Sequence, residues 1–459
     1  MRTNLDFQNP YRTLSSPFTL GADQRPLQVF IDRATLRDGL PTIMLDEFAD
    51  APDCEIVTTR KGGENRLILG KIKNDVQLVR IVLDDSYIET GVWYPQTWKR
   101  FAEKPILVEG AKLPRGPWDA VDYRLERYLL VNVAHHGQAD LYVTDDQFLL
   151  EYSPQDFLKV NVVSSEDAIA IIGAHLRNRH CYLVRGSNEG SFKHFLDESL
   201  FFPILNATVF DVDVVGVRMQ SEKHLKAMTE AWQSIRHRNE QLLKSRDLMI
   251  FQRLQIHNNR TTDNAMYYFD MFLLVMGGAL DLVARSVDIA LRIDSSWEAI
   301  GWHQCRWFAA LRKSDRALSD KFEEPSRLRS VLRLHALLRN TIHGIHLQSI
   351  HLSDNGRPHE GLMVIDPSQK KEASYLLEAL GGAQRWGVVD SRSEELWIRP
   401  GEFIESLLAE YANFLKQVFV HLRQSESINW SQMPDPKSPF DADTRNRVKY
   451  LAGLGSGAY

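Results

Sequence analysis

The sequence has few cysteines and no long apolar segment. Its three cysteines, Cys54, Cys181 and Cys305, lie far apart and in no metal-binding spacing. An odd number of scattered cysteines argues against a disulfide framework and favours a reducing compartment. The longest uncharged apolar run, residues 271–280, is too short to cross a bilayer. The first residues also lack the apolar core of a signal peptide. We therefore expect a soluble, cytoplasmic protein without a membrane partner.

The chain also lacks a strong excess of charge of either sign. Its 459 residues carry a net charge of −5 at pH 7, so binding to a polyanion would require a local basic patch. Hydrophobic residues make up 44% and charged residues 25%, as is usual for globular proteins with substantial cores. No glycine-rich phosphate loop follows a predicted strand, which argues against a nucleotide-binding β–α fold.

Short segments with alternating apolar residues predict strands in the first half of the chain. The alternation in Asp75-Val76-Gln77-Leu78 indicates one buried and one exposed face, as in an antiparallel sheet. We therefore expect residues 1–220 to form a β-rich domain, either a sandwich or barrel-like, with a short α+β extension. Such a domain could bind a ligand or a protein. The predicted strands are Gln28–Ile31, Glu55–Thr59, Arg66–Ile72, Val76–Leu83, Tyr87–Tyr94, Tyr128–Val133 and Phe148–Tyr152.

Helical periodicity dominates residues 221–424, for which we expect an α-helical bundle. Thr261-Thr262-Asp263 is a good N-cap for the longest helix, which should extend from Asn264 to about Arg292. Apolar residues nearly surround this helix, so it should be the buried centre of the bundle. Residues 425–459 are rich in Pro, Asp, Ser and Gly, which predicts a flexible tail. The fold class expected for the chain is α+β.

One stretch of this helical half places polar residues in an apolar helix. Arg339, His343 and His346 lie at positions i, i+4 and i+7, so on a helix they share one face. The planar guanidinium fits phosphate oxygens, and an imidazole can move a proton near neutral pH. Together they suffice for metal-free cleavage of RNA through its 2′-hydroxyl. The neighbouring Asn340 could position a partner or bind a phosphate oxygen.

The segment Arg339-Asn340-Thr341-Ile342-His343-Gly344, late in a series of long helices, resembles the signature of the HEPN superfamily. The resemblance covers residues 260–423 or so. It implies a metal-independent endoribonuclease that uses no cofactor and completes its site in a homodimer. Such domains occur in toxin–antitoxin and antiviral defence systems. The spacing usual in the family fits His346, whereas the adjoining Asn340 and Gly344 favour His343, so either histidine is a candidate.

A basic helix face offers a way to bind the expected RNA substrate. Its members are Arg236-His237-Arg238-Asn239 together with Lys223, Lys226, Lys244 and Arg246. Such a face attracts phosphates at a distance. It is equally compatible with a solvated helix surface that binds nothing.

A non-catalytic interpretation of the motif is also open. Arg339 could pair with Asp281 or Asp288 of the long apolar helix, because structural ion pairs are common. The chain would then be a HEPN-like scaffold that binds nucleotides, RNA or a protein. The histidines near the motif show no recognised metal-binding pattern, so we expect no metal.

Overall fold

A computed structural model gives the architecture of the chain. It describes residues 25–51, 53–59, 67–73, 76–82, 87–93, 95–103, 116–152, 160–179, 182–183, 195–196, 202, 205–207, 209–210, 222–254, 259–344, 347–354, 357–390, 395–424 and 442–454. The chain divides into two compact units, Met1–Leu176 and Arg177–Tyr459. The expected boundary near residue 220 lies inside the second unit.

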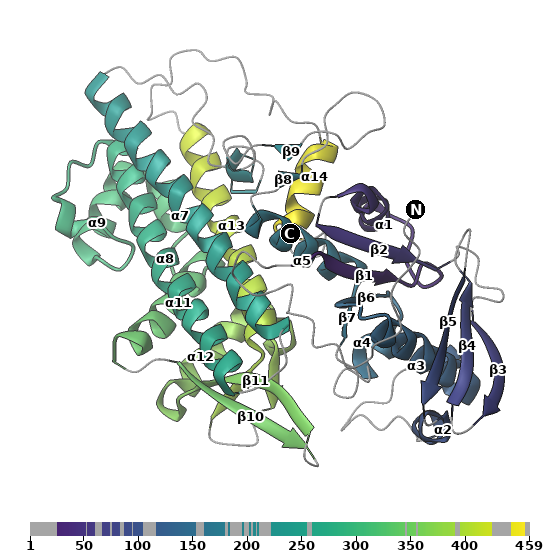
Figure 1. Ribbon diagram of the computed structural model, residues 1–459. Coiled ribbons are helices and arrows are strands. Elements are labelled where there is room, and N and C mark those ends of the chain that lie inside the picture. Colours follow the sequence, from purple (N-terminus) through teal and green to yellow (C-terminus); the bar gives the residue numbers. More distant parts are fainter. Residues whose placement is uncertain are drawn as a thin grey trace. The chain divides into compact units, whose positions relative to one another are not determined.

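A four-stranded parallel sheet forms the centre of the first unit (Figure 1). Its strand order is β2-β1-β6-β7, and each neighbouring pair is parallel. Parallel neighbours need crossover connections, and helices supply them here. The strands are β1 (Leu27–Ile31), β2 (Cys54–Thr58), β6 (Leu141–Val143) and β7 (Asn161–Val163), and the helices are α1 (Leu40–Glu47), α3 (Val121–His136), α4 (Gln147–Tyr152) and α5 (Ser165–Asn178).

A smaller antiparallel sheet is inserted between β2 and α3. Its strands are β3 (Leu67–Lys73), β4 (Val76–Val82) and β5 (Tyr87–Trp93), in the order β3-β4-β5, followed by α2 (Pro95–Glu103). The antiparallel pairing predicted from the alternation around Val76 is confirmed. Val79 and Ile81 of the central strand are fully buried. Successive side chains of a strand point to opposite faces, so these odd-numbered positions are not the face that the alternation in residues 75–78 predicted to be buried.

The expected sandwich or barrel in the first half is wrong, because the main sheet is parallel and covered by helices. Two apolar runs that we predicted as strands are helical: Tyr128–Val133 lies inside α3 and Phe148–Tyr152 lies inside α4. Leu129, Leu130 and Val131 of α3 are fully buried in one core with residues of both sheets. A helix enclosed on nearly all sides has a continuous apolar sequence, which periodicity alone does not distinguish from a buried strand.

Long helices dominate the second unit. α7 (Glu222–Leu254) and α8 (Asn259–Leu291) pack along each other (Figure 1), and the short separation between them in the sequence makes the pair antiparallel. α8 also packs against α9, α11 and α13, as expected of a central helix, but it is not buried on all sides, because Tyr267, Met271 and Leu274 are exposed. The further helices are α9 (Cys305–Ser314), α10 (Arg316–Asp320), α11 (Arg327–Gly344), α12 (Pro367–Ala379), α13 (Pro400–Gln424) and α14 (Ala442–Leu451). In the part of the chain that the structure describes, no helix could span a membrane.

The second unit also contains strands that the sequence pattern did not all reveal. β10 (Gln348–Asp354), β11 (Arg357–Ile365), β12 (Val388–Asp390) and β13 (Leu396–Ile398) form an antiparallel sheet in the order β10-β11-β13-β12. The strands β12 and β13 pair antiparallel, and the β10–β11 hairpin was not predicted. Short elements complete the fold: β8 (Tyr182–Leu183), β9 (Phe195–Leu196), and the 3-10 turns η1 (Phe48–Asp50), η2 (Pro117–Asp119), η3 (Trp297–Ala299) and η4 (Ala383–Trp386).

Candidate functional site

Arg339 lies where α11 crosses α8. A side chain at Gly277 of α8 would place its Cβ 3.2 Å from Arg339 Cδ and 3.2 Å from His335 Cε1. Glycine at this position therefore lets the arginine lie close to the backbone of α8. Arg339 is half-buried, and its Nε is enclosed without a hydrogen-bond partner among the described residues. The terminal nitrogens of Arg339 are not among the enclosed atoms, so these nitrogens, and not Nε, can donate to an external acceptor.

Three titratable groups, Asp281, His303 and His335, interact electrostatically with this guanidinium. Partial desolvation raises the pKa of Asp281, and the charges of Arg339 and Arg285 oppose that increase. The pKa of His303 is lowered, first by partial desolvation and then by the charges of Arg329 and Arg339. His303 is consequently neutral near pH 7 and able to accept a proton. We call Gly277, Asp281, His303, His335 and Arg339 the arginine face.

His335 is the buried imidazole of the arginine face. It is 3% exposed, and its Nε2 donates a hydrogen bond to the carbonyl oxygen of Leu273 at 2.9 Å. Desolvation lowers its pKa from 6.5 to about 4, with smaller contributions from Arg339 and His303. This histidine is therefore a neutral structural donor that joins α11 to α8.

The titration of His335 predicts a pH-dependent stability of the second unit. Between pH 6.5 and about 4 the unfolded chain binds a proton at this imidazole that the folded chain does not, so stability falls as pH falls. The expected loss at the low end is about 3 kcal/mol, given the usual free energy per pKa unit. Hydrogen exchange of α11 amides as a function of pH measures it. The His335→Gln variant keeps an N–H donor and should flatten the profile; an equally steep profile would contradict this assignment.

The structure describes the other residues of the motif to different extents. Asn340 is exposed on α11, one residue beyond Arg339. His343 lies in the last turn of α11, one helical turn after Arg339, and its side chain is outside the described set. His346 lies outside the described residues altogether. His303, which the sequence motif did not include, is the described imidazole open to solvent beside Arg339. It precedes the motif in the chain, and no local spacing indicates that the two meet.

The two carboxylates considered as partners of Arg339 differ in what they do. Asp288 is buried and accepts hydrogen bonds from Trp307 Nε1 at 2.9 Å and from the backbone N–H of Ser295 at 3.4 Å. Asp281 is exposed and affects Arg339 through its charge. Among the described residues, no carboxylate oxygen lies within 4.0 Å of Arg339 as an ion pair. A sealed structural salt bridge does not account for this arginine.

The predicted basic face of α7 is not a continuous surface. Arg246 is 2% exposed and pairs with Asp247 and Glu405. Asn239 is buried and accepts a hydrogen bond from the Tyr411 hydroxyl at 2.7 Å. Arg238 lies over Gly278 of α8. These residues hold helices together, so the patch available for a polyanion is smaller than the sequence suggested.

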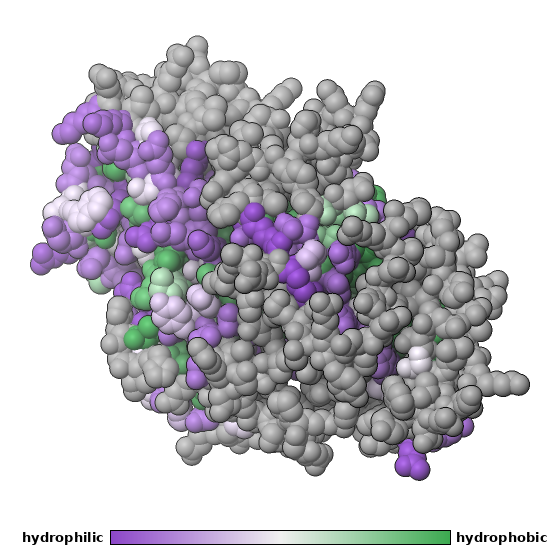
Figure 2. All heavy atoms as spheres, in the orientation of Figure 1, coloured by the Kyte–Doolittle hydropathy of each residue, from purple (hydrophilic) through white to green (hydrophobic). Residues whose placement is uncertain are grey.

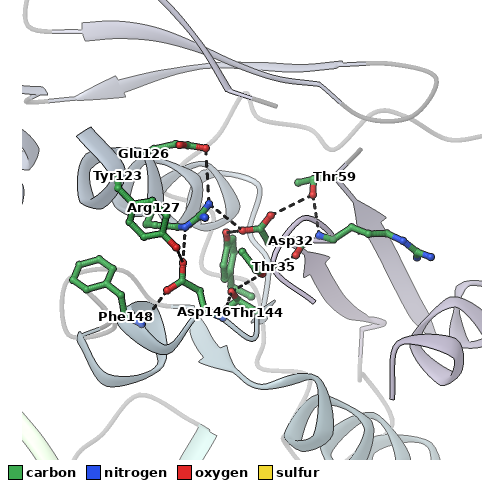
Figure 3. Close-up of polar contacts among 11 residues, drawn as sticks. Asp32, Thr35, Thr59, Tyr123, Glu126, Arg127, Thr144, Asp146 and Phe148 are labelled. Carbon is green, nitrogen blue, oxygen red and sulfur yellow. Dashed lines mark hydrogen bonds and ion pairs between the residues drawn. The ribbon is translucent and has the colours of Figure 1, made fainter. Parts of the chain in front are cut away.

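A second polar cluster lies in the first unit, at the carboxyl ends of β1 and β6 (Figure 3). The chain passes from β1 to β2 on one side and returns to β6 on the other side of β1. Ligands of open α/β sheets bind at such a switch point. Asp32 follows β1, and Thr144 and Asp146 follow β6. Thr35 and Thr144 share a hydrogen bond of 2.8 Å that joins the two strand ends.

Arg127 of α3 is the counterion of this cluster. Its Nε donates to Asp146 Oδ2 at 2.6 Å, and the Tyr123 hydroxyl donates to the same oxygen at 2.5 Å. One terminal nitrogen of Arg127 lies 3.8 Å from Asp32 Oδ2, and the Tyr142 hydroxyl donates to that oxygen at 3.0 Å. Because these carboxylates and the arginine are buried, the cluster is an internal network, in which one guanidinium lies between two carboxylates, that fixes the edge of the sheet.

Sequence reasoning missed this cluster because Asp32 and Thr35 are separated from their partners Tyr142 and Thr144 by 110 and 109 residues. The segment Tyr142-Val143-Thr144-Asp145-Asp146 carries a detectable signal: a short apolar strand that ends in a hydroxyl and two carboxylates. Placing it beside Asp32 required the parallel strand order. Within the described ranges, no group of three or more His, Cys, Asp and Glu is arranged to hold a metal ion.

Comparison with known proteins identifies no relative of this chain. No family model, no curated protein and no solved structure matches the chain.

Proposed function

We propose that the second unit is a metal-independent endoribonuclease whose phosphate-binding group is Arg339. The observation that carries the proposal is that Arg339 is half-buried beside α8 with an enclosed Nε that has no hydrogen-bond partner among the described residues. A guanidinium in that state is suited to donate hydrogen bonds to the oxygens of a phosphate. The resemblance of the Arg339–Gly344 segment to the HEPN signature supports the same chemistry.

The reaction would transfer the phosphoryl group within the RNA. The 2′-oxygen attacks the phosphorus and the bond to the 5′-oxygen breaks, which leaves a 2′,3′-cyclic phosphate and a 5′-hydroxyl. An imidazole accepts the proton of the 2′-hydroxyl, and a second acid, an imidazolium or water, supplies one to the 5′-oxygen. Arg339 stabilises the negative charge of the pentavalent phosphorane. His303 and the motif histidines His343 and His346 are candidates for the base, and Asn340 is a candidate for positioning.

Purified full-length protein should cut single-stranded RNA in the presence of EDTA. The products should carry the cyclic phosphate and 5′-hydroxyl ends described above, which end-specific labelling and mass spectrometry identify. A DNA strand of the same sequence lacks the 2′-hydroxyl and should stay intact. Removing the base imidazole should slow cleavage by about 10²–10⁴-fold, so His303→Ala and His343→Ala show which histidine serves. Intact RNA, or cleavage of the DNA strand, would count against the proposal.

The cellular setting and assembly state are part of the proposal. Cys54 and Cys305 form no disulfide among the described residues, and three scattered cysteines support a reducing compartment such as the cytoplasm. Tyr267, Met271 and Leu274 of α8 are exposed by 61%, 37% and 40% and lie at i, i+4 and i+7, which supports a homodimer. Sedimentation velocity of the purified protein tests the dimer, and a monomer at all concentrations would exclude it. If RNA binds without being cut, the alternative function is supported, namely a non-catalytic RNA-binding scaffold.

A further inference from the structure

An exposed tryptophan lies against an arginine at the end of α8. Trp297, in the 3-10 turn η3, is 59% exposed. The guanidinium carbon of Arg285 lies 3.2 Å from the centroid of its ring. The described surface around α9 is mainly hydrophilic (Figure 2), so a large exposed indole is an exception there. The guanidinium of Arg285 covers one face of the indole ring, and the opposite face is left for a ligand.

The loop that carries this indole is held in one conformation. Arg292 and Asp294 adopt φ values of 52° and 57°, a region that few residues other than glycine occupy. The buried carboxylate of Asp288 accepts hydrogen bonds from Ser295 N–H and from the Trp307 indole. A preorganised aromatic ring loses little conformational entropy when a ligand binds to it.

The tryptophan and the proposed phosphate site are related through one face of α8. Gly277, Asp281 and Arg285 are spaced four residues apart, so they lie in a row that extends over about 12 Å of helix. Arg339 lies against Gly277, and Arg285 lies on Trp297. The charge of Asp281 acts on both guanidiniums. The row therefore has a phosphate-binding cation at one end and an aromatic ring with a cation at the other.

We infer that Trp297, stacked on Arg285, is a platform for a base of single-stranded RNA whose backbone lies against Arg339. This inference rests on the proposed function and specifies its substrate as unpaired RNA. A base of a paired helix is already stacked on both sides, whereas an unpaired base can lie on the free indole face. Arg285 Nε is enclosed and donates no hydrogen bond among the described residues, so the main role of this cation is to lie on the ring and attract phosphate.

Binding of a 2′-O-methylated oligoadenylate to the full-length protein tests the platform. This strand has normal bases but no free 2′-hydroxyl, so binding is measured by fluorescence anisotropy without cleavage. Trp297→Leu should weaken binding about tenfold or more, because stacking of one base on an aromatic ring contributes an effect of that size. Trp297→Phe should retain most of the affinity. Tyr375→Leu is the matched control, since Tyr375 is 55% exposed on α12 and should not change binding.

An abasic strand of the same length separates stacking from a general loss of affinity. Without bases, wild type and Trp297→Leu should bind equally. Equal binding of the base-containing strand by both proteins, or no binding by the wild type, would overturn the platform. Cleavage that depends on Arg339 together with binding indifferent to Trp297 would overturn the platform alone. If binding depends on Trp297 but no RNA is cleaved, the platform proposal stands and the proposed nuclease function is refuted.

Discussion

Replacing Arg339 with alanine should reduce RNA cleavage by about 10²–10³-fold, as removal of one charge-stabilising donor does in other enzymes. The guanidinium is needed most when the phosphorane carries its extra charge, so the loss should appear mainly in kcat. Arg339→Lys keeps the charge but not the planar donor pair, and should recover only part of the rate. Single-turnover cleavage of a labelled RNA measures both variants.

Arg333 provides a matched control on the same helix. It lies six residues before Arg339 in α11 and is engaged by Glu324 and Glu372, each at 2.8 Å. Arg333→Ala removes a cation of the same kind and disturbs only partly exposed ion pairs, which contribute little to stability. Cleavage should therefore be unchanged. If Arg333→Ala and Arg339→Ala lose activity equally, net positive charge rather than a specific phosphate contact is responsible.

The fold of Arg339→Ala should be close to that of the wild type. The side chain makes no ion pair within 4.0 Å and leaves its Nε unpaired among the described residues, so truncation removes mainly the packing of its stem on α8. Such a change commonly costs about 1 kcal/mol or less at a partly exposed site. Unchanged hydrogen exchange in α8 and α11 would show that lost cleavage reflects lost chemistry.

Local patterns in the sequence predicted the helices better than the sheets. The apolar periodicity of α8 depends on residues close together in the chain, so this helix and its C-terminal end were predicted well. Its start was not, because α8 begins at Asn259 and the expected cap Thr261-Thr262-Asp263 lies inside the helix. The three strands β3 to β5 were also found, because apolar and polar residues alternate in their sequences. Each of these strands pairs with the next one along the chain, so the pairing followed from the order of the strands.

The parallel pairing of the strands in the main sheet could not be predicted from local sequence patterns. The strands β6 and β7 are three residues each, too short for a pattern, and their partners lie far away in the chain. The apolar run in α3 was taken for a strand because the helix is buried against both sheets. The same separation hid His303 from the arginine motif and Asp32 from Asp146. In each case the missing information was tertiary: which distant segments lie side by side.

Replacing Arg127 with methionine should destabilise the first unit by about 3–5 kcal/mol, the usual effect of removing one partner of a buried ion pair. Asp146 would lose its donor at 2.6 Å and Asp32 its nearest cation, and both carboxylates would remain buried at the ends of adjacent strands. Because the chain has two compact units, a global melting temperature is not a sufficient measure. Hydrogen exchange of β1, β6 and α3 amides reports the local change.

Two further variants show whether the effect of Arg127→Met arises from the unpaired charge. Arg33→Met removes a cation that pairs with Asp46 at a partly exposed site of the same unit, and should cost about 1 kcal/mol or less. Adding Asp146→Asn to Arg127→Met removes one uncompensated carboxylate while the Tyr123 hydroxyl keeps an acceptor, so exchange protection should partly return. If the double variant loses as much stability as the two single variants together, the arginine acts through packing and not as the counterion of Asp146. Partial recovery would instead show that charge neutralisation by α3 is what allows two aspartates to lie at the carboxyl edge of a buried parallel sheet.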